Sequence, residues 1–160
     1  GLGGIGAEVA AIARSLGMHV IGWNRSGIES EIPCDYCELD DLMEQADVVS
    51  LHLALCDETH GLIDSKRLGL MKSGAILVNT ARSQLIDEQA LMKAVSNGDI
   101  IAGLDVFHQE PIPLTSSIVK SSNVVLSSHS GWYTREAISR LLIMGFEAMR
   151  EEIDLLNKEV

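Results

Sequence analysis

Three side chains along this sequence carry complementary chemistry. Arg82, Glu110 and His129 each follow an apolar run that predicts a buried strand. Because ligands of open α/β sheets bind beyond the carboxyl ends of the strands, we expect the three side chains to converge on one sheet edge. An arginine fork matches a carboxylate, and a histidine beside a carboxylate can donate a proton near neutral pH. The set predicts a site that binds a small acid and performs acid/base catalysis.

The chain opens with a G-x-G-x-x-G turn, Gly1-Leu2-Gly3-Gly4-Ile5-Gly6. Glycines in such a turn permit a tight bend and a close approach of the backbone to a pyrophosphate. The context fits, because a helix is predicted from Gly4 to Leu16 and a strand from Met18 to Trp23. This favours a dinucleotide site over an ordinary glycine-rich helix start. The candidate cofactor contacts of the turn are Gly1, Gly3, Gly4, Ile5 and Gly6.

The residues after the predicted strand at 18–23 bear on the choice of cofactor. Asn24 lies 21 residues after Gly3, where an acidic residue that binds the adenosine ribose is expected. Asn24 carries no charge, and Arg25 and Ser26 can donate hydrogen bonds to phosphate oxygens. The cofactor is therefore NADP or NAD, with NADPH expected to bind better than NADH. Arg25 could equally stack on the adenine.

Apolar, strand-like runs alternate with helical segments through most of the chain, and each run is short and rich in β-branched residues. This order predicts an α/β fold, a Rossmann-type doubly wound parallel sheet with right-handed crossovers. Asp87 is predicted to cap the third crossover helix and Gly98 to end it. The predicted strands are 48–53, 75–79, 101–105 and 124–126, and the predicted helices between them are 39–46, 65–71 and 88–96.

Two helices have apolar positions at helical spacing. The helix that starts at Gly4 has Ile5, Val9, Ile12 and Leu16. A long closing helix is expected from Thr134 to about Lys158, with its apolar stripe packed on this sheet or on a neighbouring domain. The stretch 108–122 reads as a loop and not as a boundary, so residues 1–160 form one dinucleotide-binding domain. The apolar stripe of the closing helix is Ile138, Leu141, Leu142, Gly145, Met149 and Ile153.

Composition excludes several kinds of partner. A formal net charge of -11 argues against nucleic acid and anionic membranes, and no apolar run approaches the length of a membrane span. Three cysteines fit a reducing compartment such as the cytoplasm better than a disulfide framework. Cys34 and Cys37 form a C-x-x-C in an acidic stretch that reads as a solvated loop, and no metal site is expected.

Several segments, in this order, resemble the D-isomer-specific 2-hydroxyacid dehydrogenase family. The resemblance implies that Arg82 binds a 2-oxo acid, that His129 donates a proton and pairs with Glu110, and that Asp105 holds the nicotinamide carboxamide. A small 2-oxo or 2-hydroxy acid is then the substrate and a homodimer the assembly. Further cofactor contacts are expected at His52, Leu53, Thr80, Ala81 and Gly131. The segments that carry the resemblance are the glycine turn, Val48-Val49-Ser50-Leu51-His52-Leu53, Asn79-Thr80-Ala81-Arg82, Leu104-Asp105-Val106-Phe107-His108-Gln109-Glu110-Pro111 and Ser128-His129-Ser130-Gly131-Trp132.

Two other readings stay open. A binding module that senses the nucleotide, like the corepressors that share this fold, would keep the same motifs. The second interpretation is an inactive fragment, because in the family the cofactor domain works together with a substrate domain, which this chain lacks. The chain also departs from the family at Asn24, where Asp is usual, and at Ala54 and Ser83, where proline and glycine are common.

No strand precedes the glycine turn in this sequence, although the fold places one there. We expect Met18–Trp23 and Ile101–Asp105 to flank the empty place, with unpaired backbone groups. The isolated chain is then expected to aggregate or to exchange elements in a dimer, and not to persist as a stable monomer.

Overall fold

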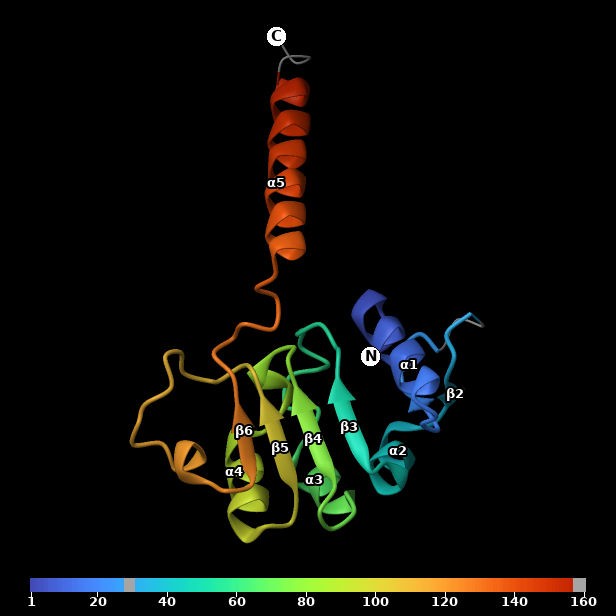
Figure 1. Ribbon diagram of the computed structural model, residues 1–160, viewed down its shortest axis with the longest axis vertical. Coiled ribbons are helices and arrows are strands. Elements are labelled where there is room, and N and C mark those ends of the chain that lie inside the picture. Colours follow the sequence, from blue (N-terminus) through green and yellow to red (C-terminus); the bar gives the residue numbers. More distant parts are fainter. Residues whose placement is uncertain (28–30, 157–160) are drawn as a thin grey trace. The chain divides into compact units, whose positions relative to one another are not determined.

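In the computed structural model, which describes residues 1–27 and 31–156, four strands form one parallel sheet (Figure 1). Their order is β3-β4-β5-β6 and their bounds are Val48–Leu51, Ile76–Asn79, Ile101–Leu104 and Val124–Leu126. The register pairs Leu51 with Asn79, Asn79 with Leu104, and Leu104 with Leu126. All four strands therefore end level with one another, which confirms the predicted α/β fold and brings the residues after each strand to one edge.

Two helices connect the strands and pack on one face of this sheet, α3 (Ser65–Leu70) and α4 (Glu88–Asn97) (Figure 1). Asp87 caps α4 by accepting a hydrogen bond from the Ala90 amide at 2.7 Å, and Gly98 ends it at a φ of 77°, both as predicted. Short 3-10 turns lie at Ser83–Leu85 (η1) and Ser117–Lys120 (η2). The largest fully buried apolar side chains between sheet and helices are Met43, Ile63, Leu77, Leu85, Ile86, Ile100 and Val95.

The N-terminal part of this unit has its own pair of strands. After α1 (Gly4–Ser15), the predicted strand 18–23 is reduced to β1 (Ile21–Gly22). It pairs in parallel with β2 (Asp35–Tyr36), and α2 (Leu39–Gln45) leads from there to β3. The prediction of a solvated loop around Cys34 and Cys37 is therefore wrong, because the two residues between these cysteines form strand β2. Burial raises the pKa of both thiols, which favours the unreactive thiol form.

One expected neighbour relation is wrong. β5 hydrogen-bonds to β4 on one side and to β6 on the other, so Ile101–Leu104 does not border a gap. The edges of the four-stranded sheet are β3 and β6, and β1 belongs to the separate two-stranded sheet. Alternation of strands and helices in the sequence does not specify this order, because strands that follow one another in the chain need not be neighbours.

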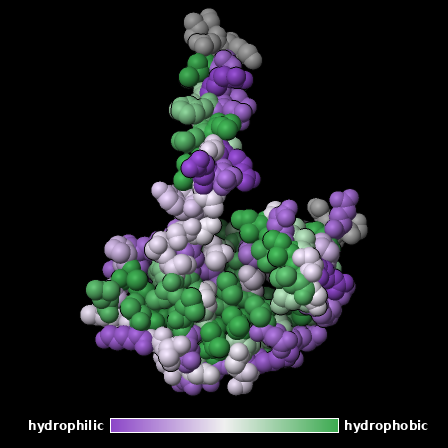
Figure 2. Space-filling model, in the orientation of Figure 1, coloured by the Kyte–Doolittle hydropathy of each residue, from purple (hydrophilic) through white to green (hydrophobic). Residues whose placement is uncertain are grey.

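Apolar side chains are exposed on the second face of the sheet and on α1. Val48, Ile76, Ile101 and Val125 are each at least 37% exposed on neighbouring strands, and Figure 2 shows apolar residues gathered over this region. The large apolar side chains of α1 are also exposed, with Ile5 at 72%, while the buried residues of that helix are Gly6 and Ala10. The small residues of α1 therefore contact the rest of this unit, whereas its large apolar residues are exposed.

The contacts divide the chain into two units, Gly1–Ser128 and His129–Val160. Within the second, α5 spans Arg135–Leu156, close to the predicted helix, whose last residues lie outside the described ones. Thr134 caps it by accepting a hydrogen bond from the Ala137 amide at 3.1 Å. No residue of α5 is buried, although its stripe is apolar. Among the described residues, no helix has both the length and the apolar character needed to cross a bilayer.

The cap of α4 gives a test of this fold. We expect Asp87→Ala to lower the free energy of unfolding by about 1 kcal/mol, because the Ala90 amide loses its acceptor. Urea denaturation of the protein that carries this chain measures the change. Asp87→Asn keeps an acceptor, and Gln89→Ala alters an exposed position of the same helix, so both should cost less than about 0.5 kcal/mol. An equal loss in Gln89→Ala would contradict the capping role.

Candidate cofactor and substrate site

The glycine turn lies against the end of β3. A Cβ atom added to Gly1 would be 2.7 Å from the carbonyl oxygen of His52, and one added to Gly6 would collide with the carbonyl oxygen of Gly1. Both positions therefore require glycine, because backbone atoms fill the space of a side chain. At Gly3 and Gly4 an added Cβ would meet no atom within 4 Å. The turn is closed toward β3 and open on the side of Gly3, where α1 begins.

His52 and Leu53, two of the predicted cofactor contacts, lie beside the turn. One Cδ of Leu53 is 2.9 Å from the position of an added Gly1 Cβ, and the Gly6 position comes within 3.3 Å of the His52 Cβ. The His52 ring shares a hydrogen bond of 2.9 Å with the Ser50 hydroxyl. Burial lowers the pKa of His52. Burial therefore favours the neutral imidazole beside the place expected for the cofactor.

The end of β1 also reaches the turn, because the Gly1 nitrogen donates a hydrogen bond to the Trp23 carbonyl at 2.9 Å. This places Asn24 next to the glycines. The Asn24 amide group donates to the Ser26 hydroxyl at 3.1 Å and to the Gly27 carbonyl at 3.3 Å. The guanidinium of Arg25 lies 3.8 Å from the carboxylate of Glu58, and both are exposed. The structure thus joins the three predicted residues in one loop and adds Glu58, which sequence reasoning missed.

The segment Thr80–Arg82 follows β4 and is shaped by a buried asparagine. Asn79 is 1% exposed; its side-chain oxygen accepts from the Ala81 amide at 3.0 Å, and its amide group donates to the Arg82 carbonyl at 2.8 Å. These two bonds close the turn that presents Arg82. The Arg82 side chain is exposed and donates to the Ala81 carbonyl. The sequence signal for Asn79 was a polar residue closing an apolar strand, which the site prediction did not use.

Asp105 and Glu110 follow β5 but differ in burial. Asp105 is 3% exposed, and its carboxylate accepts a hydrogen bond from the Ser127 hydroxyl. Glu110 is exposed and accepts from the Phe107 amide at 2.9 Å, which folds the loop back on itself. The structure therefore places the predicted carboxylates on one loop with distinct partners. Ser127, one residue past β6, was not predicted.

His129 and Gly131 belong to the second unit, so their convergence with Arg82 and Glu110 stays a prediction. Within its own unit, His129 has a φ of 54°, in the left-handed region that residues other than glycine rarely adopt. Its carbonyl accepts a hydrogen bond from the Trp132 indole at 2.9 Å. Such a conformation marks functional positions more often than ordinary loops, because surrounding contacts must hold it.

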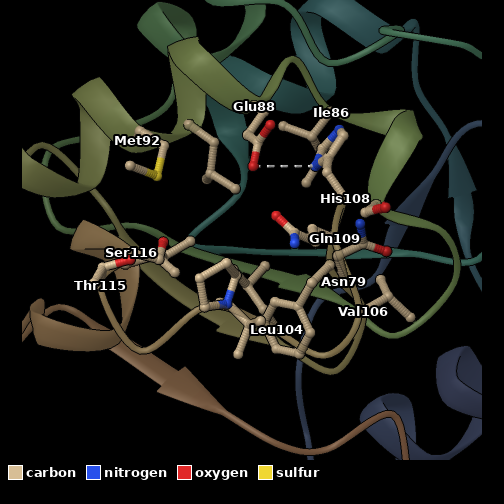
Figure 3. Close-up of a pocket in the computed structure, with 16 residues that line it drawn as sticks. Asn79, Ile86, Glu88, Met92, Leu104, Val106, His108, Gln109, Thr115 and Ser116 are labelled. Carbon is tan, nitrogen blue, oxygen red and sulfur yellow. Dashed lines mark ion pairs between the residues drawn. The ribbon is translucent and has the colours of Figure 1, made fainter.

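A pocket of about 210 Å³ lies between α4 and the loop after β5, within the first unit (Figure 3). Asn79, Leu104 and Val106 reach it from the strand ends, whereas neither Arg82 nor Glu110 lines it. At one side His108 lies 3.9 Å from the carboxylate of Glu88, the pair joined by the dashed line in Figure 3. This pocket adjoins the predicted substrate edge without containing its charged groups, and it gives His108 a partner that the sequence did not indicate.

Comparison with known proteins identifies the family. Residues 1–131 match the family described as D-isomer specific 2-hydroxyacid dehydrogenase, NAD binding domain. The chain is 42% identical over 170 aligned residues to a glyoxylate reductase of Korarchaeum cryptofilum, covering 100% of this chain and 51% of that protein. It therefore spans about half the length of the curated relative that it matches.

Solved structures of related proteins support the same family assignment. An acyclic imino acid reductase in complex with NADPH and D-Arg superposes with a TM-score of 0.89 at 35% identity, covering 97% of this chain and 50% of that one. D-Lactate dehydrogenase from Aquifex aeolicus, complexed with NAD and lactic acid, gives 0.88 at 32% identity, covering 96% and 52%. By its match over residues 1–131 and its agreement with these folds, the chain belongs to the NAD-binding domain family of the D-isomer specific 2-hydroxyacid dehydrogenases.

Proposed function

We propose that this chain is the cofactor-binding domain of an oxidoreductase that transfers hydride between NAD(P)H and a small 2-oxo or 2-hydroxy acid. The observation that carries the proposal is the glycine turn, which backbone atoms close at Gly1 and Gly6 and which is open at Gly3. An open turn at the start of α1 can admit a pyrophosphate to backbone N–H groups and to the positive end of the helix. The names of the relatives, glyoxylate reductase and D-lactate dehydrogenase, support the substrate class.

The residues around the turn fit a dinucleotide along its length. Gly3 and the first residues of α1 would receive the pyrophosphate, and Asn24, Arg25 and Ser26 the adenosine ribose. Asp105, buried at the end of β5, would accept a hydrogen bond from the nicotinamide carboxamide. When bound, the cofactor supplies or accepts the hydride. Reported complexes of structural relatives contain NADPH in one case and NAD in another, so both forms suit this fold.

On the substrate side, the exposed guanidinium of Arg82 would bind the carboxylate of the acid, since its planar fork of N–H donors matches the two carboxylate oxygens. His129 would give a proton to the carbonyl oxygen during reduction and take it back in the reverse direction. Glu110 would stabilise the charged imidazole. The left-handed backbone of His129 supports a functional role for this residue.

The proposal extends to the setting of the protein. Cys34, Cys37 and Cys56 are free thiols, which suits a reducing compartment such as the cytoplasm. We also propose that the protein forms a homodimer through this domain, as the family resemblance implies.

Gly3→Ala tests the cofactor site. We expect it to weaken NAD(P)H binding by about tenfold or more, because a methyl group would occupy the open side of the turn. Stability should change by no more than about 1 kcal/mol, since Gly3 has a φ of -70° that alanine adopts freely. Fluorescence titration gives the dissociation constant, and thermal melting gives the stability. Gly69→Ala, also in open space but far along the chain in α3, should leave binding unchanged. Unaltered binding in Gly3→Ala would refute this site.

His129→Ala tests the proton donor. We expect turnover of a 2-oxo acid to fall by roughly 10²- to 10⁴-fold, while the dissociation constant of the cofactor changes little. Steady-state kinetics on the natural protein that carries this chain, with glyoxylate and hydroxypyruvate as substrates, measures the effect. His60→Ala, at an exposed position without an assigned role, serves as the control. Near-normal turnover in His129→Ala would remove His129 from the mechanism.

The choice of cofactor is tested at position 24. We expect NADPH to bind more tightly than NADH, and Asn24→Asp to shift the ratio toward NADH by about tenfold, because a carboxylate binds ribose hydroxyls and repels a 2′-phosphate. Dissociation constants for both cofactors give the ratio. Gln89→Glu makes the same change of charge on exposed α4 and should leave it unchanged. A wild-type preference for NADH of tenfold or more would overturn the expectation.

A further inference from the structure

A hydroxyl group at the end of β6 holds the buried acid at the end of β5. The Ser127 hydroxyl donates to Oδ1 of Asp105 at 2.5 Å. Asp105 is 3% exposed, whereas Ser127 is exposed. A buried carboxylate must be compensated by hydrogen bonds, so this contact has an energetic reason.

The backbone on both sides of this contact is fixed by the sheet. The Asp105 amide donates to the Asn79 carbonyl at 3.0 Å, and the Ser127 amide donates to the Leu104 carbonyl at 3.0 Å. The hydrogen-bond ladders therefore continue one residue beyond β5 and β6. With both backbones held, the remaining freedom of Asp105 is rotation of its side chain, and the bond from Ser127 restrains that rotation.

We propose that Ser127 is a positioning residue for the nicotinamide end of the cofactor, acting through Asp105. The inference rests on the proposed function, in which Asp105 accepts a hydrogen bond from the carboxamide. A carboxylate whose Oδ1 is bound to Ser127 presents its second oxygen in a defined direction, and a correctly directed acceptor orders the carboxamide and the ring attached to it. Ser127 itself touches neither substrate nor cofactor in this scheme.

The test compares whole cofactor with cofactor that lacks nicotinamide. In the natural protein that carries this chain, we expect Ser127→Ala to weaken binding of the preferred reduced cofactor by about tenfold, the effect of one hydrogen bond to a charged group. Binding of ADP-ribose, or of its 2′-phosphate where NADPH is preferred, should change less than about twofold, because that fragment does not reach Asp105. Ser127→Thr keeps the hydroxyl and should restore binding of the whole cofactor.

A double-mutant comparison identifies the route of the effect. Asp105→Asn alone should weaken the whole cofactor but not the ADP-ribose fragment, and adding Ser127→Ala to it should cause little further loss. The Ser127 proposal is overturned if Ser127→Ala binds both ligands normally, if it weakens both equally, or if Ser127→Thr fails to restore binding. Normal binding of the cofactor by Asp105→Asn would instead overturn the proposed contact of Asp105. The two Ser127 variants decide the proposal even where Asp105→Asn does not fold.

Discussion

The close approach of the glycine turn to the end of β3 is the constraint on which the proposed cofactor site depends. Gly1 lies against the His52 carbonyl, and Gly6 against the Gly1 carbonyl, at separations that leave no space for a side chain. This contact sets where α1 begins and brings Trp23, and so Asn24, beside the turn through the Gly1 nitrogen. A larger residue at either glycine would collide with the backbone atoms of this contact.

Paired polar groups at the strand ends shape the part of the proposed site that would hold the nicotinamide and the substrate. Asn79 closes the turn before Arg82, Ser127 holds Asp105, and Glu110 binds the Phe107 amide in its own loop. Each pairing joins two polar groups near the end of the sheet. Because the last residues of β3, β4, β5 and β6 are in register, these pairings lie along one edge. The contacts that pair the polar groups at the strand ends are thus the same contacts that would shape the proposed site.

Burial is a feature that the local pattern did not determine. The apolar positions of α1 lie at helical spacing, and Ile5 and Leu16 are more than 70% exposed, while Gly6 and Ala10 are buried. Helical spacing identifies a face but not what covers it, and the turn demands small residues where α1 meets β3. In the same way, the acidic residues around Cys34 suggested a loop, whereas pairing with Ile21 and Gly22 makes Asp35–Tyr36 a strand. Strand pairing depends on a distant partner, which local composition cannot reveal.

The sequence by itself determined the α/β class, the glycine turn, the caps at Asp87 and Gly98, and the family, because each depends on residues close together in the chain or on motifs in a set order. Only the tertiary structure decided that β5 lies between β4 and β6, that Glu58 faces Arg25, and that Ser127 binds Asp105 across 22 residues of sequence. Those contacts join segments whose separation in the chain carries no local signal. They arise when parallel strands align and bring their ends into register.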